Sequence, residues 1–160
     1  MEKYELLLEN AKKEILMAEH MINVTYRLVN DQKMLISVAS RLRDAFANTM
    51  AAVLMYDVYY RKIPQFEMKY DTILSIFKAR SIRRYNFNPE YIVLIQEMHD
   101  LMDFHRKSPI QFTRQDKLVI CSDSYNTKTI SAENIKNYIN KAKLFIADTE
   151  RMVGKNAGSN

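Results

Sequence analysis

The chain has 160 residues and a formal net charge of +5, with 48% hydrophobic and 27% charged residues, which fits one globular domain and excludes a disordered chain. Its only two glycines, Gly154 and Gly158, lie close to the C-terminal end. Phosphate-binding loops, dinucleotide-binding turns and the nucleophile elbow of hydrolases all need glycine at a sharp turn. The sequence therefore excludes a nucleotide cofactor of these kinds, and no other cofactor is expected.

Hydropathy and cysteine content indicate the cellular location of the protein. No apolar run is long enough to cross a membrane, and the mixed-charge N-terminus differs from a secretory signal. The single cysteine, Cys121, allows no internal disulfide and fits a reducing compartment. These features predict a cytoplasmic protein without a membrane partner.

The first sixty residues predict two long helices packed as an antiparallel hairpin. Apolar and small side chains recur every three or four positions from Tyr4 to Val29, and again from Leu35 to Tyr59. Residues 30–31 interrupt the pattern and supply the turn. Both stripes follow a heptad rule, which favours packing of the two helices side by side.

The middle of the chain predicts two shorter helices. Apolar spacing over residues 66–77 indicates the third helix, whereas residues 80–88 have no clear period and are interpreted as a loop. The run Asn88-Pro-Glu is typical of a helix start, because it combines a capping side chain, a proline at the first helical position and an acid in the first turn. It predicts a fourth helix that ends near Arg106.

The last third of the chain changes character. Residues 110–114 alternate between apolar and polar side chains, residues 117–122 are rich in β-branched types, and a turn separates them, which predicts a β-hairpin. A polar loop follows. Ser131 is the predicted N-cap of the last helix, which is expected to end near Met152.

Together these elements predict a mainly α fold. The expected architecture is an antiparallel helical bundle of about five helices with a small β-hairpin before the last helix. One domain is expected over residues 1–153, and residues 154–160 are expected to form a disordered tail.

A basic and aromatic stretch is the first candidate site. Residues 61–91 carry seven basic and three acidic residues, which accounts for most of the net positive charge. Guanidinium groups pair with phosphates and exposed rings stack on unpaired bases, so the stretch predicts contact with RNA. The alternative is that the rings fold into the core while the arginines pair with acids such as Glu67 and Asp71. The candidate nucleic-acid-binding residues are Arg80, Arg83, Arg84, Tyr85 and Phe87.

Two histidines on the predicted fourth helix are the second candidate site. His99 and His105 are six positions apart, about 120° around a regular helix, so they cannot bind one metal ion and no metal site is expected. His105 lies beside Arg106 near the helix end, where a phosphate could be held and a proton moved. The alternative is a core histidine at position 99 and a surface histidine at position 105.

The order of these helices resembles the HEPN superfamily of helical bundles, many of which are metal-independent ribonucleases or partners of nucleotidyltransferases, usually as dimers. In the run from His99 to His105, His105 takes the position of the family's catalytic histidine and Asp100 that of its polar residue. His99 stands where the family has an arginine. The resemblance covers the topology of residues 1–106. Residues 107–123 are similar to a segment of small archaeal proteins of unknown activity.

These observations favour a HEPN-like domain that catalyses no reaction, dimerises and contacts RNA or a nucleic-acid-bound partner. Two alternatives stay open. The first is a metal-independent ribonuclease with His105 as acid or base and with His99 or Arg106 stabilising the phosphate. The second is a helical protein-interaction module, in which the first two helices pair with a partner helix.

Overall fold

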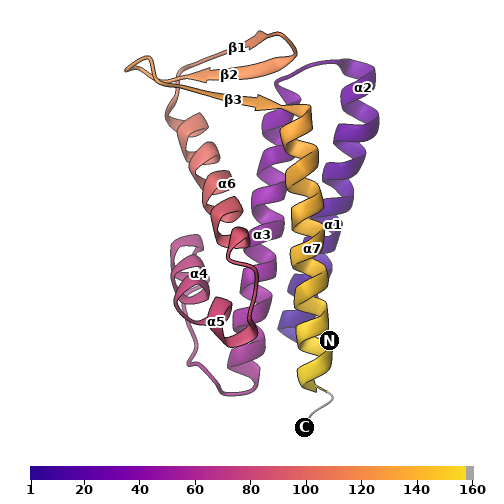
Figure 1. Ribbon diagram of the computed structural model, residues 1–160, viewed down its shortest axis with the longest axis vertical. Helices are drawn as coiled ribbons and strands as arrows, with labels where there is room; N and C mark the ends of the chain where they lie inside the picture. The colour runs from indigo at the N-terminus through magenta and orange to yellow at the C-terminus, as the bar shows by residue number, and fades with distance from the viewer. Residues whose placement is uncertain (158–160) are drawn as a thin grey trace.

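Three long helical stretches form the body of the protein, whose structure is a computed structural model that describes the backbone of residues 1–157 and the side chains of residues 1–154 (Figure 1). Their bounds are α1 (Lys3–His20), the π-helical turn η1 (Met21–Thr25) and α2 (Tyr26–Val29) in the first stretch, α3 (Met34–Tyr59) in the second and α7 (Ala132–Ala157) in the third. All three stretches contact one another. The predicted antiparallel pair of long helices is confirmed.

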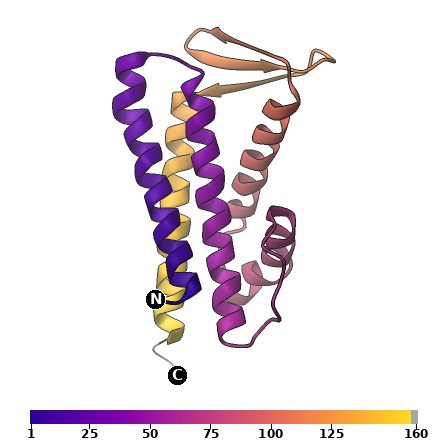
Figure 2. The same cartoon turned by 180° about the vertical axis from the view of Figure 1, so that it is seen from behind.

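A second group of helices packs against one side of α3. Their bounds are α4 (Tyr70–Ile76), the π-helical turn η2 (Phe77–Ser81), α5 (Ile82–Tyr85) and α6 (Glu90–Lys107). Figures 1 and 2 show the stretch from α4 to α5 and the helix α6 stacked along the bundle axis. The loop expected over residues 80–88 is therefore wrong in its first part, since the chain stays helical to Tyr85. A π-helical turn has a longer period than an α-helix, so apolar side chains do not recur every 3.6 residues there although the chain stays helical.

Asparagine takes the place of glycine where two of these helical stretches end. Asn30 after α2 and Asn86 after α5 have φ values of 52° and 53°, in the left-handed region that asparagine tolerates better than most residues. The predicted helix starts are confirmed. The Glu90 N–H donates to Asn88 Oδ1 at 3.0 Å, and the Asn134 N–H donates to Ser131 Oγ at 3.1 Å.

A three-stranded antiparallel sheet closes the end of the bundle opposite the start of α1 and the end of α7 (Figure 1). Its strands, in spatial order, are β1 (Ile110–Arg114), β2 (Lys117–Cys121) and β3 (Thr127–Ser131). The predicted hairpin is confirmed, and Gln115 and Asp116 both have positive φ, as a two-residue type I′ turn requires. β3 is not predicted from the sequence, because Ile130 is its only buried residue and one buried position shows no alternation.

The core is centred on the fully buried ring of Phe145 in α7. It lies 4.8–6.3 Å, between ring centroids, from four aromatic rings on α3, η2, α6 and the segment between α5 and α6. Those rings belong to Phe46, Phe77, Phe87 and Tyr91. One aromatic cluster therefore joins both groups of helices.

The observed fold is mainly α, with a small antiparallel sheet before the last helix, as predicted. The last helix, α7, continues to Ala157, past the end expected at Met152, and residues 158–160 of the expected disordered tail lie outside the described residues. In the part of the chain that the structure describes, none of the helices combines the length and the apolar character that a membrane span requires.

Candidate nucleic-acid interface

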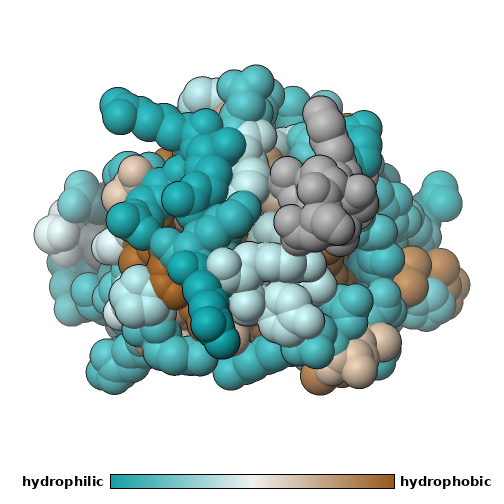
Figure 3. All heavy atoms as spheres, turned by 90° about the horizontal axis from the view of Figure 1, so that it is seen from below, coloured by the Kyte–Doolittle hydropathy of each residue, from teal (hydrophilic) through white to brown (hydrophobic). Residues whose placement is uncertain are grey.

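The basic stretch comes to lie at the end of the bundle where α1 begins and α7 ends. α3 ends there, and the chain returns there through η2, which contacts α3, and α5 (Figure 1). Seen from this end, hydrophilic side chains cover most of the molecule and leave small hydrophobic areas between them (Figure 3). The end face is therefore polar and open to solvent.

Five exposed cations at this end form no ion pair with any described residue. We call them the basic end: Arg61, Lys62, Lys78, Arg80 and Arg83. The nearby acid Glu67, which the alternative interpretation pairs with the arginines, instead pairs with Lys69 at 2.9 Å. Lys62 Nζ lies 5.8 Å and 5.7 Å from the ring centroids of Tyr56 and Tyr85. Since none of the five cations has a carboxylate partner among the described residues to give up when an anion arrives, the basic end can bind phosphate directly.

Arg84 and Tyr85 have a different role, because both face a buried carboxylate. Asp57 on α3 is 1% exposed, its Oδ1 accepts a hydrogen bond from the Tyr85 hydroxyl, and its Oδ2 lies 3.4 Å from Arg84 Nη1. Burial, reinforced by the bond to Asp57, raises the pKa of Tyr85 above its ordinary value. Unpaired buried charge is costly, so these two side chains compensate Asp57 and are held in place by it.

Phe87 is part of the core. It is 5% exposed, and its ring centroid lies 5.6 Å from those of Phe77 and Phe145. The prediction that Phe87 stacks on a base is therefore wrong, and the alternative in which the rings fold inward applies to it and to Tyr85.

Tyr59 is a ring that the sequence pattern places in the core but the structure exposes. It is 51% exposed, and its ring centroid lies 4.9 Å from that of Tyr60. Tyr59 belongs to the last turn of α3, and its ring makes a T-shaped contact with Tyr4 of α1, with centroids 5.7 Å apart. Its position in the final turn beside Arg61 is the signal that could have indicated an exposed ring.

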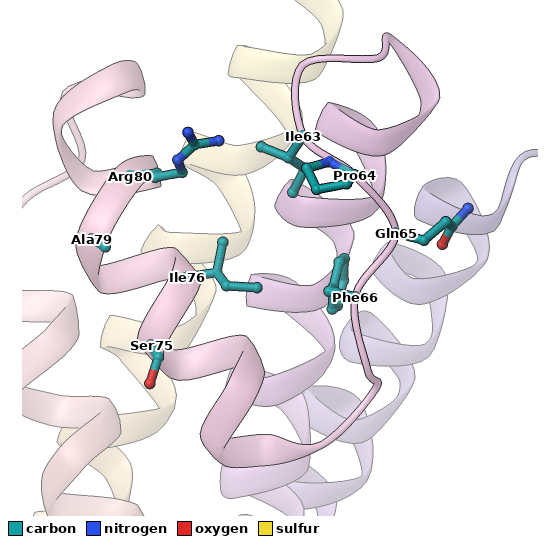
Figure 4. Close-up of a pocket in the computed structure, with 8 residues that line it drawn as sticks. All are labelled: Ile63, Pro64, Gln65, Phe66, Ser75, Ile76, Ala79 and Arg80. Atoms are coloured by element: carbon teal, nitrogen blue, oxygen red, sulfur yellow. The ribbon is translucent and has the colours of Figure 1, made fainter.

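A pocket of about 430 Å³ opens beside Arg80, between the segment after α3 and the stretch α4–η2 (Figure 4). Its lining residues are Ile63, Pro64, Gln65, Phe66, Ser75, Ile76, Ala79 and Arg80. The guanidinium of Arg80 extends from η2 toward Ile63, and the side chain of Ile76 points into the space between the two segments. The sequence reveals neither this pocket nor the proximity of Arg80 to residues 63–66.

The histidines lie in separate surroundings. The ring of His99 stacks on Tyr70, with centroids 4.3 Å apart, and its Nε2 lies 3.9 Å from a carboxylate oxygen of Asp71. The buried Nδ1 of His99 has no hydrogen-bond partner among the described residues. His105 instead lines a pocket of about 590 Å³ between α1, α3 and α6.

The three candidate catalytic residues therefore do not form one site. The pocket of His105 contains Arg41 and Glu14, whose side chains form an ion pair at 3.2 Å, but neither His99 nor Arg106 lines it. Arg106 pairs with Asp103 on the same helix. The separation follows from helix geometry, because positions six apart point in different directions.

Among the residues with described side chains, no group of three or more His, Cys, Asp or Glu residues is arranged to hold a metal ion. Comparison with known proteins finds no matching family model, no matching curated protein and no matching solved structure. The functional assignment therefore depends on the geometry of the sites described above.

Proposed function

We propose that the protein is a HEPN-like RNA-contacting domain that holds the phosphate backbone at its basic end and catalyses no reaction. The observation that carries this proposal is the set of five exposed cations without ion-pair partners in the described part of the chain. Arg80 and Arg83 keep the phosphate-binding role expected from the sequence, and Arg61, Lys62 and Lys78 join them. Arg84, Tyr85 and Phe87 support the fold beneath.

RNA is the favoured polyanion because an exposed aromatic ring lies beside the cations. Tyr59 precedes Arg61 and Lys62 by two and three positions and is 51% exposed, which leaves ring surface for an unpaired base beside its contacts with Tyr4 and Tyr60. Phosphate contacts give affinity without sequence specificity, so we expect binding that depends strongly on salt and weakly on sequence.

The experiment measures fluorescence anisotropy of a labelled single-stranded RNA across a salt series in EDTA. For single strands each phosphate contact contributes about 0.7 to the slope of log affinity against log salt. A triple variant, Lys62→Gln, Arg80→Gln and Arg83→Gln, is therefore expected to lower the slope by about 2 and to weaken binding more than about tenfold at low salt.

The matched control removes the same charge elsewhere. Lys13, Arg27 and Lys136 are exposed cations on α1, α2 and α7 that form no ion pair with a described residue. Their triple Gln variant is expected to keep most of the affinity and slope. Equal losses in both triple variants would mean that net charge alone drives binding, and unchanged binding in the first would refute the proposed interface.

A second candidate function, metal-independent RNA cleavage, is favoured by the surroundings of His105. Its pocket offers an imidazole for proton transfer and the Arg41 guanidinium for a phosphate, and it also contains Asp44. This function predicts RNA cleavage in EDTA that is lost in His105→Ala and retained in His99→Ala. Intact RNA in the same reactions supports a binding domain.

Dimerisation is part of the proposal, and exposed apolar side chains along α1, η1 and α2 support it. These side chains belong to Leu6, Leu16, Val24 and Leu28. Light scattering on the purified protein tests it, since the monomer has a mass of 18.9 kDa and a dimer twice that mass. A soluble monomer without a large exposed apolar patch would count against the protein-interaction alternative. A cytoplasmic location belongs to the proposal as well, because the single free cysteine fits a reducing compartment.

A further inference from the structure

The pocket beside Arg80 combines apolar walls with a single charge. Its walls are formed by Ile63, Pro64, Phe66, Ile76 and Ala79. Arg80 is the one charged side chain among its lining residues, and its guanidinium has no carboxylate partner in the described part of the chain. A volume of about 430 Å³ falls within the range of small-molecule sites, which is about 300–1,000 Å³.

The polar groups around this pocket decide what kind of molecule fits. Gln65 and Ser75 are its only other polar lining residues, and in Figure 4 both side chains point away from the space that Phe66 and Ile76 face. A molecule in this space therefore meets no polar side chain except Arg80. A nucleobase would lose hydrogen bonds to water along its edge without replacement, whereas a hydrocarbon group loses none.

We propose that this pocket binds a small amphiphilic anion, a molecule with a hydrocarbon chain or plain aromatic ring and one terminal carboxylate or phosphate. The apolar part lies between Phe66 and Ile76, and the anionic group pairs with the Arg80 guanidinium. Burial of the hydrocarbon supplies the affinity, and the charge-assisted hydrogen bonds to Arg80 fix which end faces outward. This inference concerns a small ligand and does not depend on RNA binding.

Isothermal titration calorimetry of the full chain with alkyl carboxylates tests both parts of the site. Decanoate is expected to bind about 15-fold more tightly than octanoate, because each buried methylene contributes about fourfold. Decanol, which has the same chain without the charge, is expected to bind about tenfold more weakly than decanoate.

Two variants separate the charge from the apolar walls. Arg80→Gln is expected to weaken decanoate binding about tenfold and to leave decanol binding unchanged. Arg83→Gln is the matched control, since Arg83 is an exposed cation of the basic end that does not line the pocket. Ile76→Trp enlarges a side chain that points into the pocket (Figure 4) and is expected to abolish binding of both molecules, with circular dichroism confirming that the variant is folded.

Several results would overturn the proposal. Decanol binding as tightly as decanoate would show that Arg80 plays no part, and unchanged binding to a folded Ile76→Trp variant would place the ligand elsewhere. Uridine or adenosine monophosphate binding more tightly than decanoate would make this a nucleobase pocket. No heat of binding at millimolar decanoate would show that the pocket takes no such ligand.

Discussion

Removal of the Tyr85 hydroxyl tests the account of the buried Asp57 carboxylate. Asp57 has two side-chain partners, the Tyr85 hydroxyl on one oxygen and Arg84 Nη1 at 3.4 Å from the other. Tyr85→Phe deletes the first partner and keeps the ring, whose centroid lies 6.2 Å from that of Phe87. The substitution therefore changes one hydrogen bond and little of the packing.

The expected cost follows from burial of the acceptor. Asp57 is 1% exposed, so water cannot replace the donor that Oδ1 loses. The contact with Arg84, at 3.4 Å, is made to Oδ2 and does not replace it either. An unsatisfied buried acceptor costs about 1–3 kcal/mol. In a chain of this length each kcal/mol lowers the melting temperature by about 2–4 °C, so we expect a decrease of about 2–12 °C.

Urea unfolding followed by far-ultraviolet circular dichroism measures this free energy, with Tyr59→Phe as the matched control. Tyr59 lies at the same end of α3, is 51% exposed and makes no hydrogen bond through its hydroxyl to a described residue. Its replacement is expected to change the free energy of unfolding by less than about 0.5 kcal/mol. Equal effects of the two substitutions would refute the role assigned to Tyr85.

Three further predictions concern the core, a helix start and alkaline pH. Phe145→Ala removes the ring at the centre of the aromatic cluster and is expected to cost about 3–5 kcal/mol in urea unfolding; a loss below about 1 kcal/mol would contradict its central place. Asn88→Ala removes the side chain that caps α6 and is expected to lower the free energy of unfolding by about 1 kcal/mol, whereas Asn88→Ser keeps a capping oxygen and should keep most of the stability. Burial raises the pKa of Tyr85, so its contribution to stability is complete below about pH 10 and is lost as the pH rises through its folded-state pKa. The alkaline decrease in stability should therefore be shallower in Tyr85→Phe, and an identical pH profile would show that this hydroxyl titrates normally.

Much of the fold could be predicted because its signals are local. The stripes of α1 and α3 specify one buried face each, and the caps at Asn88 and Ser131 act within three residues of their own position. The turn at residues 115–116 likewise depends on its own backbone conformation. Each of these features is determined by neighbours along the chain, which a sequence displays directly.

The candidate site could be predicted only in part, because its side chains are sorted by contacts between distant segments. The basic stretch is visible in the sequence. Arg84 and Tyr85 are nevertheless held inside the protein by Asp57, which lies 27 and 28 residues before them. Phe87 is buried because Phe145 of the last helix packs against it.

The sequence by itself determined the helical class, the long hairpin of α1 and α3, the β1–β2 hairpin before α7 and a concentration of positive charge in residues 61–91. Only the tertiary structure decided that Arg80 and Arg83 stay unpaired within the described part of the chain, that Arg84 and Tyr85 compensate a buried acid, and that a pocket forms beside Arg80. Periodicity and capping depend on interactions within a few residues, whereas burial, ion pairing and pocket shape depend on which helices meet in space.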